Sequence, residues 1–289
     1  MLKTTLLVLS VLLPLAAQEA IDQATDSKLR SEESEHSQIM HTLHMLTDRY
    51  GPRVTGTPNH EQAAKWAIAE MQRWGLQNGH LESWDFGHPG WLNESASGHL
   101  IAPVRENIKF EVLAWTPSTS GKVEASAIQL VPPQGPFPPE PPEAANPPGP
   151  PRRPQRLGPL KKDLDQWIAE NQGKVRGKIV LIGKAAVIPV DFTPPAKRRP
   201  DDAVKAQYDP ERAANNGPRR EPPPADPERY SLNEANAKID AMLVSGGATV
   251  RINDAARGEG IIVAQQHRGY DTATAVPTVI LRNDDFGRI

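Results

Sequence analysis

The sequence predicts an α/β fold in which amphipathic helices pack on a sheet. Two segments near the N-terminus, and residues 231–245, carry apolar side chains at helical spacing. Short apolar runs lie between such segments, and Ile179-Val180-Leu181-Ile182 is typical of a buried strand. The N-terminal helices and strands are too few to close a core by themselves, so we expect that region to be part of a larger layered structure.

Two helices are predicted in the N-terminal region. The first begins near Ser31, whose hydroxyl would cap it, and ends at Gly51-Pro52. Its apolar positions are Ile39, Leu43, Leu46 and Tyr50. The second follows Thr57-Pro58, a favourable N-cap and first helical residue, and ends at Gly75. Its apolar face is formed by Ala64, Ala67, Ile68, Met71 and Trp74.

Strands and helices alternate in the rest of the chain. Helices are predicted over 160–171 and 231–245, and Gly246-Gly247 closes the second. The inward side chains of the second are Ala235, Ile239, Met242 and Leu243. The predicted strands cover residues 80–86, 109–115, 123–131, 179–182, 249–252, 260–264 and 276–281, and Gly, Pro or Ser bounds each of the first three. A last helix is expected to begin at Asn283.

Two stretches rich in proline interrupt these elements. Residues 132–159 favour extended polyproline conformation, which indicates a solvated insertion or spacer, and the alternative is a ligand for proline-recognising domains. Residues 194–227 mix proline with both signs of charge. We expect a solvated loop there, in preference to an anion site formed by its arginine pairs.

Composition limits the partners and the chemistry. The net charge is −2, so no overall field favours nucleic acid or an anionic membrane, and neither is expected as a partner. The chain contains 30 prolines, so part of it is not expected to be packed. It contains no cysteine, which excludes disulfides, a thiolate nucleophile and cysteine ligands for zinc.

Residues 1–17 are typical of a secretory signal peptide. Lys3 supplies the positive charge, Leu6–Leu15 supplies the apolar run, and Ala17 is a small residue at the expected cleavage point. The run is shorter than the roughly 20 residues needed to span a bilayer. We therefore expect a secreted or periplasmic protein cleaved near Ala17, and the alternative is a buried N-terminal helix.

Three neighbouring histidines and one histidine–glutamate pair could suggest a metal site. His41 and His44 are three residues apart and could face one way on a helix, with His36 nearby, but exposed or boundary positions are favoured. His60-Glu61 resembles the start of a zinc-binding His-Glu-x-x-His helix, yet the position four residues after His60 is Ala64. Glu61 is better explained as an acidic residue in the first turn of a helix.

Other catalytic patterns are missing or incomplete. The sequence contains no Gly-x-Ser-x-Gly elbow and no phosphate-binding glycine loop before a helix. Gly246-Gly247 follows a helix, which is the wrong end for binding an anion. Asp284-Asp285 is the remaining carboxylate pair, and helix capping is its favoured role.

Residues 46–59 resemble the opening of metallopeptidase family 28. The matching run is Leu-Thr-Asp-Arg-Tyr-Gly-Pro-Arg-Val-Thr-Gly-Thr-Pro-Asn, followed by Trp66 and by Arg73-Trp74-Gly75-Leu76. The family contains zinc aminopeptidases and carboxypeptidase Q-like exopeptidases. Residues 114–121 are similar to the family's passage out of the peptidase domain.

Later segments are similar to a protease-associated (PA) domain, which many of these enzymes carry as an insertion. They are Val175–Leu181, the helix ending in Gly246-Gly247-Ala248, and Val276-Pro277-Thr278-Val279. The resemblance implies that 18–115 is the N-terminal portion of a zinc-exopeptidase α/β domain. It implies that 116–289 is an incomplete PA domain, with proline-rich insertions at 132–159 and 194–227.

The resemblance also implies two zinc ions, bridged by an Asp and a water, with a Glu as base. The family's ligand pattern begins with His-x-Asp after the PA domain, and this sequence contains no His-x-Asp. We therefore expect a chain truncated before the metal site, with no catalytic or metal residue assigned and substrate-binding residues unknown. One hypothesis is the N-terminal fragment of a secreted exopeptidase that hydrolyses peptides. The other is a non-catalytic PA-type module that binds proteins.

Overall fold

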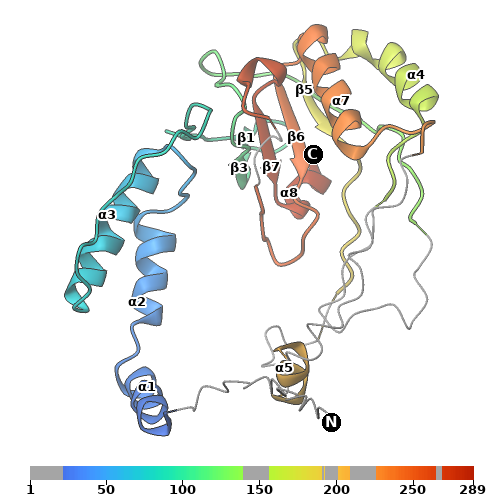
Figure 1. The fold of residues 1–289 in the computed structure, drawn as a ribbon. Coiled ribbons are helices and arrows are strands. Elements are labelled where there is room, and N and C mark those ends of the chain that lie inside the picture. Colours follow the sequence, from blue (N-terminus) through green and yellow to red (C-terminus); the bar gives the residue numbers. More distant parts are fainter. Residues whose placement is uncertain (1–21, 139–155, 191, 193–200, 209–225, 265–268) are drawn as a thin grey trace, which may run out of the picture. The chain divides into compact units, whose positions relative to one another are not determined.

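The computed structural model describes residues 22–138, 156–190, 192, 201–208, 226–264 and 269–289 (Figure 1). The chain divides into two compact units: unit 1 is Met1–Trp84 and unit 2 is Asp85–Ile289. The predicted signal peptide, with its cleavage at Ala17, lies outside the described residues. So do residues 139–155, 194–200 and 209–225 of the proline-rich stretches.

Unit 1 begins with a helix that starts earlier than predicted. Helix α1 covers Gln23–His36, because the Asp22 carboxylate accepts the N–H groups of Ala24 at 3.0 Å and Thr25 at 3.3 Å and so caps it. The predicted start at Ser31 is therefore wrong. Helix α2, Ile39–His44, follows a break at Ser37 and continues as a π-helix over Met45–Arg49.

Helix α3, Pro58–Arg73, confirms the predicted start of the second helix. The Thr57 hydroxyl accepts the His60 N–H at 3.2 Å, and Pro58 is the first helical residue. Gly75, at φ +90°, follows the helix end. Of the predicted apolar face, Ala64, Ala67 and Ile68 are half-buried, whereas Met71 and Trp74 are exposed.

Unit 2 contains a mostly parallel five-stranded sheet in the order β3-β7-β6-β5-β4, which confirms the predicted α/β fold class. Strands β4 to β7 run parallel, and β3 pairs with β7 in the antiparallel sense. Their bounds are β3 Phe110–Val112, β4 Ala127–Leu130, β5 Ile179–Ile182, β6 Val250–Asp254 and β7 Thr278–Leu281. The predicted domain boundary between residues 115 and 116 falls inside unit 2, after β3, and that domain assignment stays a prediction.

Two predicted strands are wrong. Residues 80–86 and 260–264 form no strand, although their composition favours one. Neither segment pairs with a described neighbour, and a strand needs such a partner for its backbone hydrogen bonds. A separate two-stranded sheet, β1 His99–Leu100 with β2 Glu106–Asn107, was not predicted.

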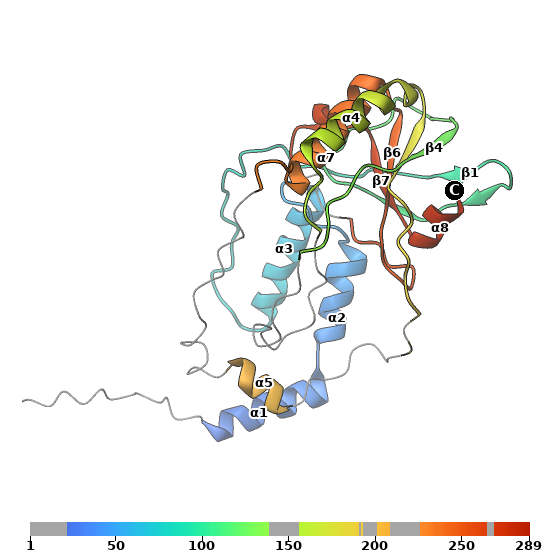
Figure 2. The same cartoon turned by 90° about the vertical axis from the view of Figure 1, so that its right-hand side faces the viewer.

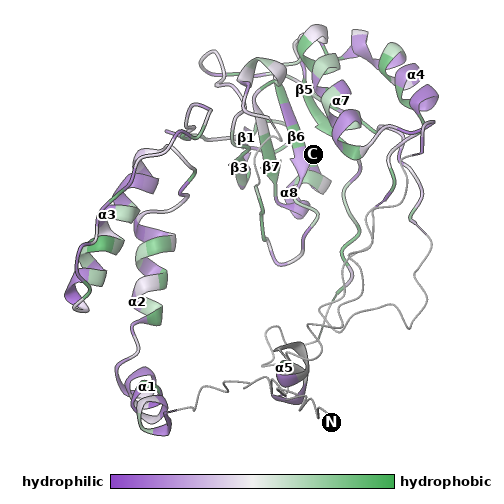
Figure 3. Ribbon diagram, in the orientation of Figure 1, coloured by the Kyte–Doolittle hydropathy of each residue, from purple (hydrophilic) through white to green (hydrophobic). Residues whose placement is uncertain are grey.

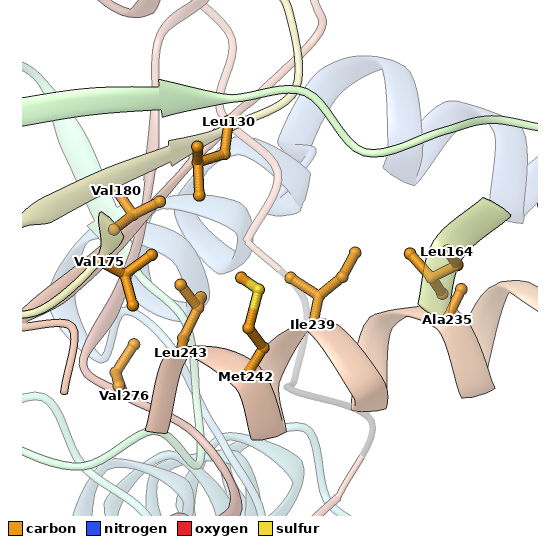
Figure 4. Close-up of a cluster of buried hydrophobic side chains, with 9 residues drawn as sticks. All are labelled: Leu130, Leu164, Val175, Val180, Ala235, Ile239, Met242, Leu243 and Val276. Atoms are coloured by element: carbon orange, nitrogen blue, oxygen red, sulfur yellow. The ribbon is translucent and has the colours of Figure 1, made fainter. Parts of the chain in front are cut away.

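One face of the large sheet is covered by helices α4, Lys161–Asn171, and α7, Leu232–Gly246 (Figure 2). Both helices were predicted. The Ser231 hydroxyl and the Glu234 carboxylate form a capping box at the start of α7, and Gly247 at φ +78° ends it. The four inward side chains predicted for α7 are buried against the sheet, together with Leu130, Leu164, Val175, Val180 and Val276 (Figure 4).

The other face of the sheet carries a smaller cluster around helix α8, Asn283–Arg288. Phe286 of α8 packs on Leu181, Ile252 and Leu281. Val180 and Leu181 therefore serve opposite faces, as side-chain alternation along a strand requires. Short 3₁₀ turns cover Gln172–Lys174 and Thr272–Thr274.

Part of the second proline-rich stretch is a helix and not a loop. Helix α5 covers Asp201–Tyr208. This run contains no proline, and Asp201 and Asp202 in its first turn interact favourably with the helix dipole. The expectation of a loop is therefore wrong for these residues.

The described flanks of both proline-rich stretches meet in one place. The Leu157 N–H donates to the Pro136 carbonyl at 2.9 Å, and the Tyr230 N–H donates to the Pro159 carbonyl at 3.1 Å. Gly158 is required here, because a Cβ atom at this position would overlap the Tyr230 carbonyl oxygen. These contacts fasten the described flanks of the two stretches to each other.

Hydropathy follows the layers of unit 2 (Figure 3). The strands of the large sheet are mainly hydrophobic, whereas α1 of unit 1 is mainly hydrophilic and buries no residue. None of the helices in the described ranges has both the length and the apolarity to cross a membrane.

Candidate functional site

The three histidines considered as metal ligands lie on two helices and two of them face different carboxylates. His36 is the last residue of α1, and its Nδ1 is 3.1 Å from Glu32 Oε2. His44 Nδ1, on α2, is 2.9 Å from Asp48 Oδ2, and this hydrogen bond lowers the pKa of Asp48 below its ordinary value. Each carboxylate is one turn away on the same stretch of helix, an arrangement that solvated helix surfaces commonly show. His41 is exposed on α2.

The His60-Glu61 pair lies in the exposed first turn of α3. Glu61 forms an ion pair with Lys65, and the hydrogen bond from Lys65 lowers the pKa of Glu61. The half-buried Ala64 occupies the position that a second imidazole would need. The structure therefore places this pair on a helix surface, near the positive end of the helix dipole, as the sequence predicted for Glu61.

The donor groups of the described residues do not fit a zinc centre. Within the described ranges, no three His, Asp or Glu side chains come together in a way that could hold a metal ion. A zinc site needs at least three such ligands in defined geometry. No catalytic step through zinc can therefore be assigned to residues described in this chain.

Asp285 is buried and does not cap helix α8, so the predicted capping role is wrong for this residue. The N-cap position belongs to Arg282. Asp285 Oδ2 accepts the backbone N–H of Lys109 and the Nε–H of Arg282, both at 3.0 Å, and Oδ1 accepts an N–H of Arg288 at 2.6 Å. The Asp285 carboxylate thus joins Lys109, the residue before β3, to the last helix. The neighbouring Asp284 is exposed.

Protonation of Asp285 is expected to destabilise unit 2. Burial raises the pKa of Asp285, but the hydrogen bonds from Arg282, Lys109 and Arg288 outweigh burial and hold it below the ordinary value of 3.8. The folded-state pKa is thus below the unfolded one, so the contribution is complete above pH 3.8 and is lost as the pH falls through the folded-state pKa.

Acid titration of the wild type and of Asp285→Asn, followed by circular dichroism, tests this expectation. The asparagine variant should be less stable near neutral pH, and the stability difference between the two proteins should shrink at acidic pH. A difference that stays constant across the acidic range would contradict the role assigned to the Asp285 carboxylate.

The carboxyl edge of the parallel strands is occupied by the protein's own loops. Asp254, the last residue of β6, accepts hydrogen bonds from Ala186 N–H at 2.8 Å, Asn283 Nδ2 at 2.9 Å and Ala256 N–H at 2.9 Å. Ligands of open α/β sheets bind at this edge where the strand order reverses. Strands β4 to β7 follow one another in space as in sequence, so these strands offer no such reversal.

A hollow of about 310 Å³ lies between the outer strand β4 and helix α8. Its lining includes Gln129 of β4, Leu181 of β5 and Phe286 and Arg288 of α8. Arg288 is already paired with Glu106 at 2.7 Å and with Asp285. The described lining of the hollow therefore holds no acid–base pair or nucleophile for catalysis.

An aromatic cluster was missed by sequence reasoning. The Tyr270 ring is stacked on His88 with centroids 3.9 Å apart, and the Trp115 ring is perpendicular to it at 4.8 Å. Trp115 is buried at φ +57°, and its Nε1–H donates to the Pro89 carbonyl at 3.0 Å. The cluster fastens the irregular segment around His88 to the sheet. Its members are far apart in sequence, so no local pattern could have indicated it.

The fold places the chain among mixed α/β proteins with a mostly parallel sheet. No model of a known protein family matches the chain, and no curated protein matches it. Two solved structures resemble it. The first is a peptidase M28 precursor from Shewanella amazonensis SB2B, with a TM-score of 0.44 and 14% sequence identity over 92% of this chain and 46% of that chain.

The second is an aminopeptidase from Aneurinibacillus sp. strain AM-1. Its TM-score is 0.34 and its sequence identity 13%, over 89% of this chain and 40% of that chain. The present chain thus spans less than half the length of either solved structure.

Proposed function

We propose that this chain is the N-terminal part of a secreted zinc exopeptidase of metallopeptidase family 28, and that it supplies none of the metal ligands. Unit 2 would then contain the PA domain inserted in that enzyme. The substrate of the intact enzyme would be a peptide, and its two zinc ions would be held by residues outside those described here.

The proposal depends on the resemblance of residues 46–59 to the opening of that family. In the structure residues 51–57 of this run form a loop whose last residue, Thr57, caps α3, and Pro58 and Asn59 begin that helix, so the phrase Gly-Thr-Pro-Asn has a defined structural role. Arg53 of the same run donates to the Leu46 and Gly51 carbonyls and holds the loop on the preceding helix. Both contacts are local, so they give this run a defined conformation between two helices.

A second candidate function is a non-catalytic module that binds proteins. Such a module needs no metal ligands, so it is consistent with the described donor groups, which do not fit a zinc centre, and with a sequence that contains no His-x-Asp. Sequencing the gene past the Ile289 codon separates the two candidates. His-x-Asp followed by acidic ligands in the same reading frame supports the enzyme, and an immediate stop codon supports the module.

The 289-residue chain, purified alone, is expected neither to retain stoichiometric zinc nor to hydrolyse peptides. The family's mechanism needs two metals and an activated water beside a base, and the described residues assemble neither. Metal analysis after dialysis, combined with aminopeptidase and dipeptidase assays, measures both properties. If the reading frame extends beyond Ile289, the longer product should both retain zinc and hydrolyse peptides.

Tight zinc binding with turnover by the 289-residue chain would contradict the proposal. The variants His36→Ala, His41→Ala and His44→Ala would then locate the ligands. Glu32→Gln and Asp48→Asn, which alter the carboxylates facing His36 and His44, provide matched controls on the same helices.

A further inference from the structure

The segment that leaves helix α3 contains an Asn–Gly pair, Asn78-Gly79. Asn78 is exposed and has φ +59°, in the left-handed region that asparagine adopts more often than most residues other than glycine. Residues 76–98 form no helix or strand. In the part of the chain that the structure describes, no hydrogen bond from the Gly79 N–H is found. This backbone nitrogen is therefore not tied into secondary structure.

His80 holds the peptide group that joins these two residues. Its Nδ1 is 2.8 Å from the main-chain oxygen of Asn78, and its Nε2 is 3.1 Å from Glu82 Oε1. A carbonyl and an ionised carboxylate only accept hydrogen bonds, so the ring satisfies both when both of its nitrogens carry protons. The hydrogen bond to the Asn78 carbonyl, followed by that to Glu82, raises the pKa of His80 above 6.5.

We propose that Asn78 is a site of spontaneous deamidation and that His80 accelerates the reaction. The carbonyl that accepts the hydrogen bond from His80 belongs to the same amide group as the Gly79 nitrogen. Donation to this oxygen withdraws electron density from the amide and makes the Gly79 N–H more acidic. That proton must leave before the nitrogen can act as a nucleophile.

The reaction uses only water and hydroxide. Hydroxide removes the Gly79 N–H proton, and the nitrogen attacks the side-chain amide carbon of Asn78, forming a carbon–nitrogen bond. The side-chain nitrogen takes a proton from water and leaves as ammonia, which completes a succinimide ring. Water then adds across one of the two ring bonds to nitrogen, giving aspartate or isoaspartate at position 78.

The local conformation permits the required rotation. The Asn78 backbone must turn out of the left-handed region to bring the Gly79 nitrogen onto the side chain. This turn is accessible because Asn78 is exposed and lies outside any helix or strand. Glycine at 79 carries no Cβ that would obstruct the approach. Ile68 and Gln72 of α3 are the described neighbours of Gly79, and neither titrates. Glu82 is the charged group found facing His80.

The second Asn–Gly pair of the chain, Asn216-Gly217, provides an internal reference. It lies outside the described residues, and Pro218 occupies the position that corresponds to His80. The full-length chain would be incubated at neutral pH. The rate of deamidation at each of the two sites would be measured by peptide mapping with mass spectrometry and by detection of isoaspartate. The ratio of the two rates removes the common dependence on temperature and hydroxide.

His80→Gln is expected to lower the ratio of the Asn78 rate to the Asn216 rate about tenfold, the factor that corresponds to losing one charge-assisted hydrogen bond. His41→Gln, which replaces another exposed histidine of unit 1, should leave the ratio unchanged. In the wild type the ratio should also fall as the pH rises through the pKa of His80, because the neutral ring loses one of its donors.

Two results would overturn the proposal. One is an Asn78 that stays intact while Asn216 is fully converted. The other is a rate ratio that His80→Gln does not change, which would mean that the Asn–Gly pair reacts without help from the imidazole.

Discussion

Replacing Arg251 with methionine is expected to destabilise unit 2 by about 3–5 kcal/mol, the usual cost of removing one member of a buried ion pair. Arg251 lies in β6, and its side chain is 9% exposed, while that of Asp240 on α7 is 5% exposed. One guanidinium nitrogen is 2.6 Å from Asp240 Oδ1, and the other two nitrogens donate hydrogen bonds to the side-chain oxygens of Asn236 and Asn253. The substitution keeps most of the side-chain volume and removes the positive charge.

The double variant Arg251→Met/Asp240→Leu separates charge burial from packing. Replacing both members of a buried pair with apolar groups is often close to neutral, so this variant should recover most of the lost stability. Urea unfolding followed by circular dichroism measures the free energy of unfolding of all three proteins. A double variant as unstable as Arg251→Met would show that the pair contributes mainly through its shape.

Leu243→Ala is expected to cost about 2–5 kcal/mol, because it leaves a cavity where α7 meets the sheet. Leu243 is fully buried and packs with Val175, Val180 and Val276 (Figure 4). Those neighbours come from separate parts of the chain, so the site cannot collapse without moving the sheet. Thermal and urea unfolding of the variant measure the loss.

Val244→Ala is the matched control for this cavity. Val244 is the next residue of α7, but its side chain is 41% exposed, so its truncation removes few contacts and improves helix propensity slightly. We expect a change of less than about 1 kcal/mol in either direction. Equal losses for the two variants would contradict the assignment of the inner face of α7.

The starts of α3 and α7 were predicted well because their signals lie within a few residues, whereas the equally local signal at Ser31 was misleading. The capping box of Ser231 with Glu234 and the closing Gly247 delimit α7, and the pair Thr57-Pro58 begins α3. The run Ile179–Ile182 is a strand because its β-branched side chains suit a position with both faces covered. Residues 80–86 and 260–264 show the limit of such signals, since a strand also requires a partner.

The alternation along β6 illustrates what a local pattern leaves open. Arg251 and Asn253 alternate with the buried Ile252, which by itself is typical of a strand with one face in water. In the structure α7 covers that face, and Asp240 on α7 compensates the charge of Arg251. The polar side chains thus specify how a helix docks.

The sequence by itself determined the α/β class and the helices with strong end signals. It also determined the absence of cysteine chemistry and of His-x-Asp. Each of these follows from residue type or from short spacing along the chain. Only the tertiary structure decided the strand order, the burial of Asp285 and the aromatic contacts around Tyr270. Lys109 and Asp285, which share a hydrogen bond, are 176 residues apart. The physical reason is that such contacts depend on which surfaces meet when the layers pack, and periodicity along the chain carries no information about that choice.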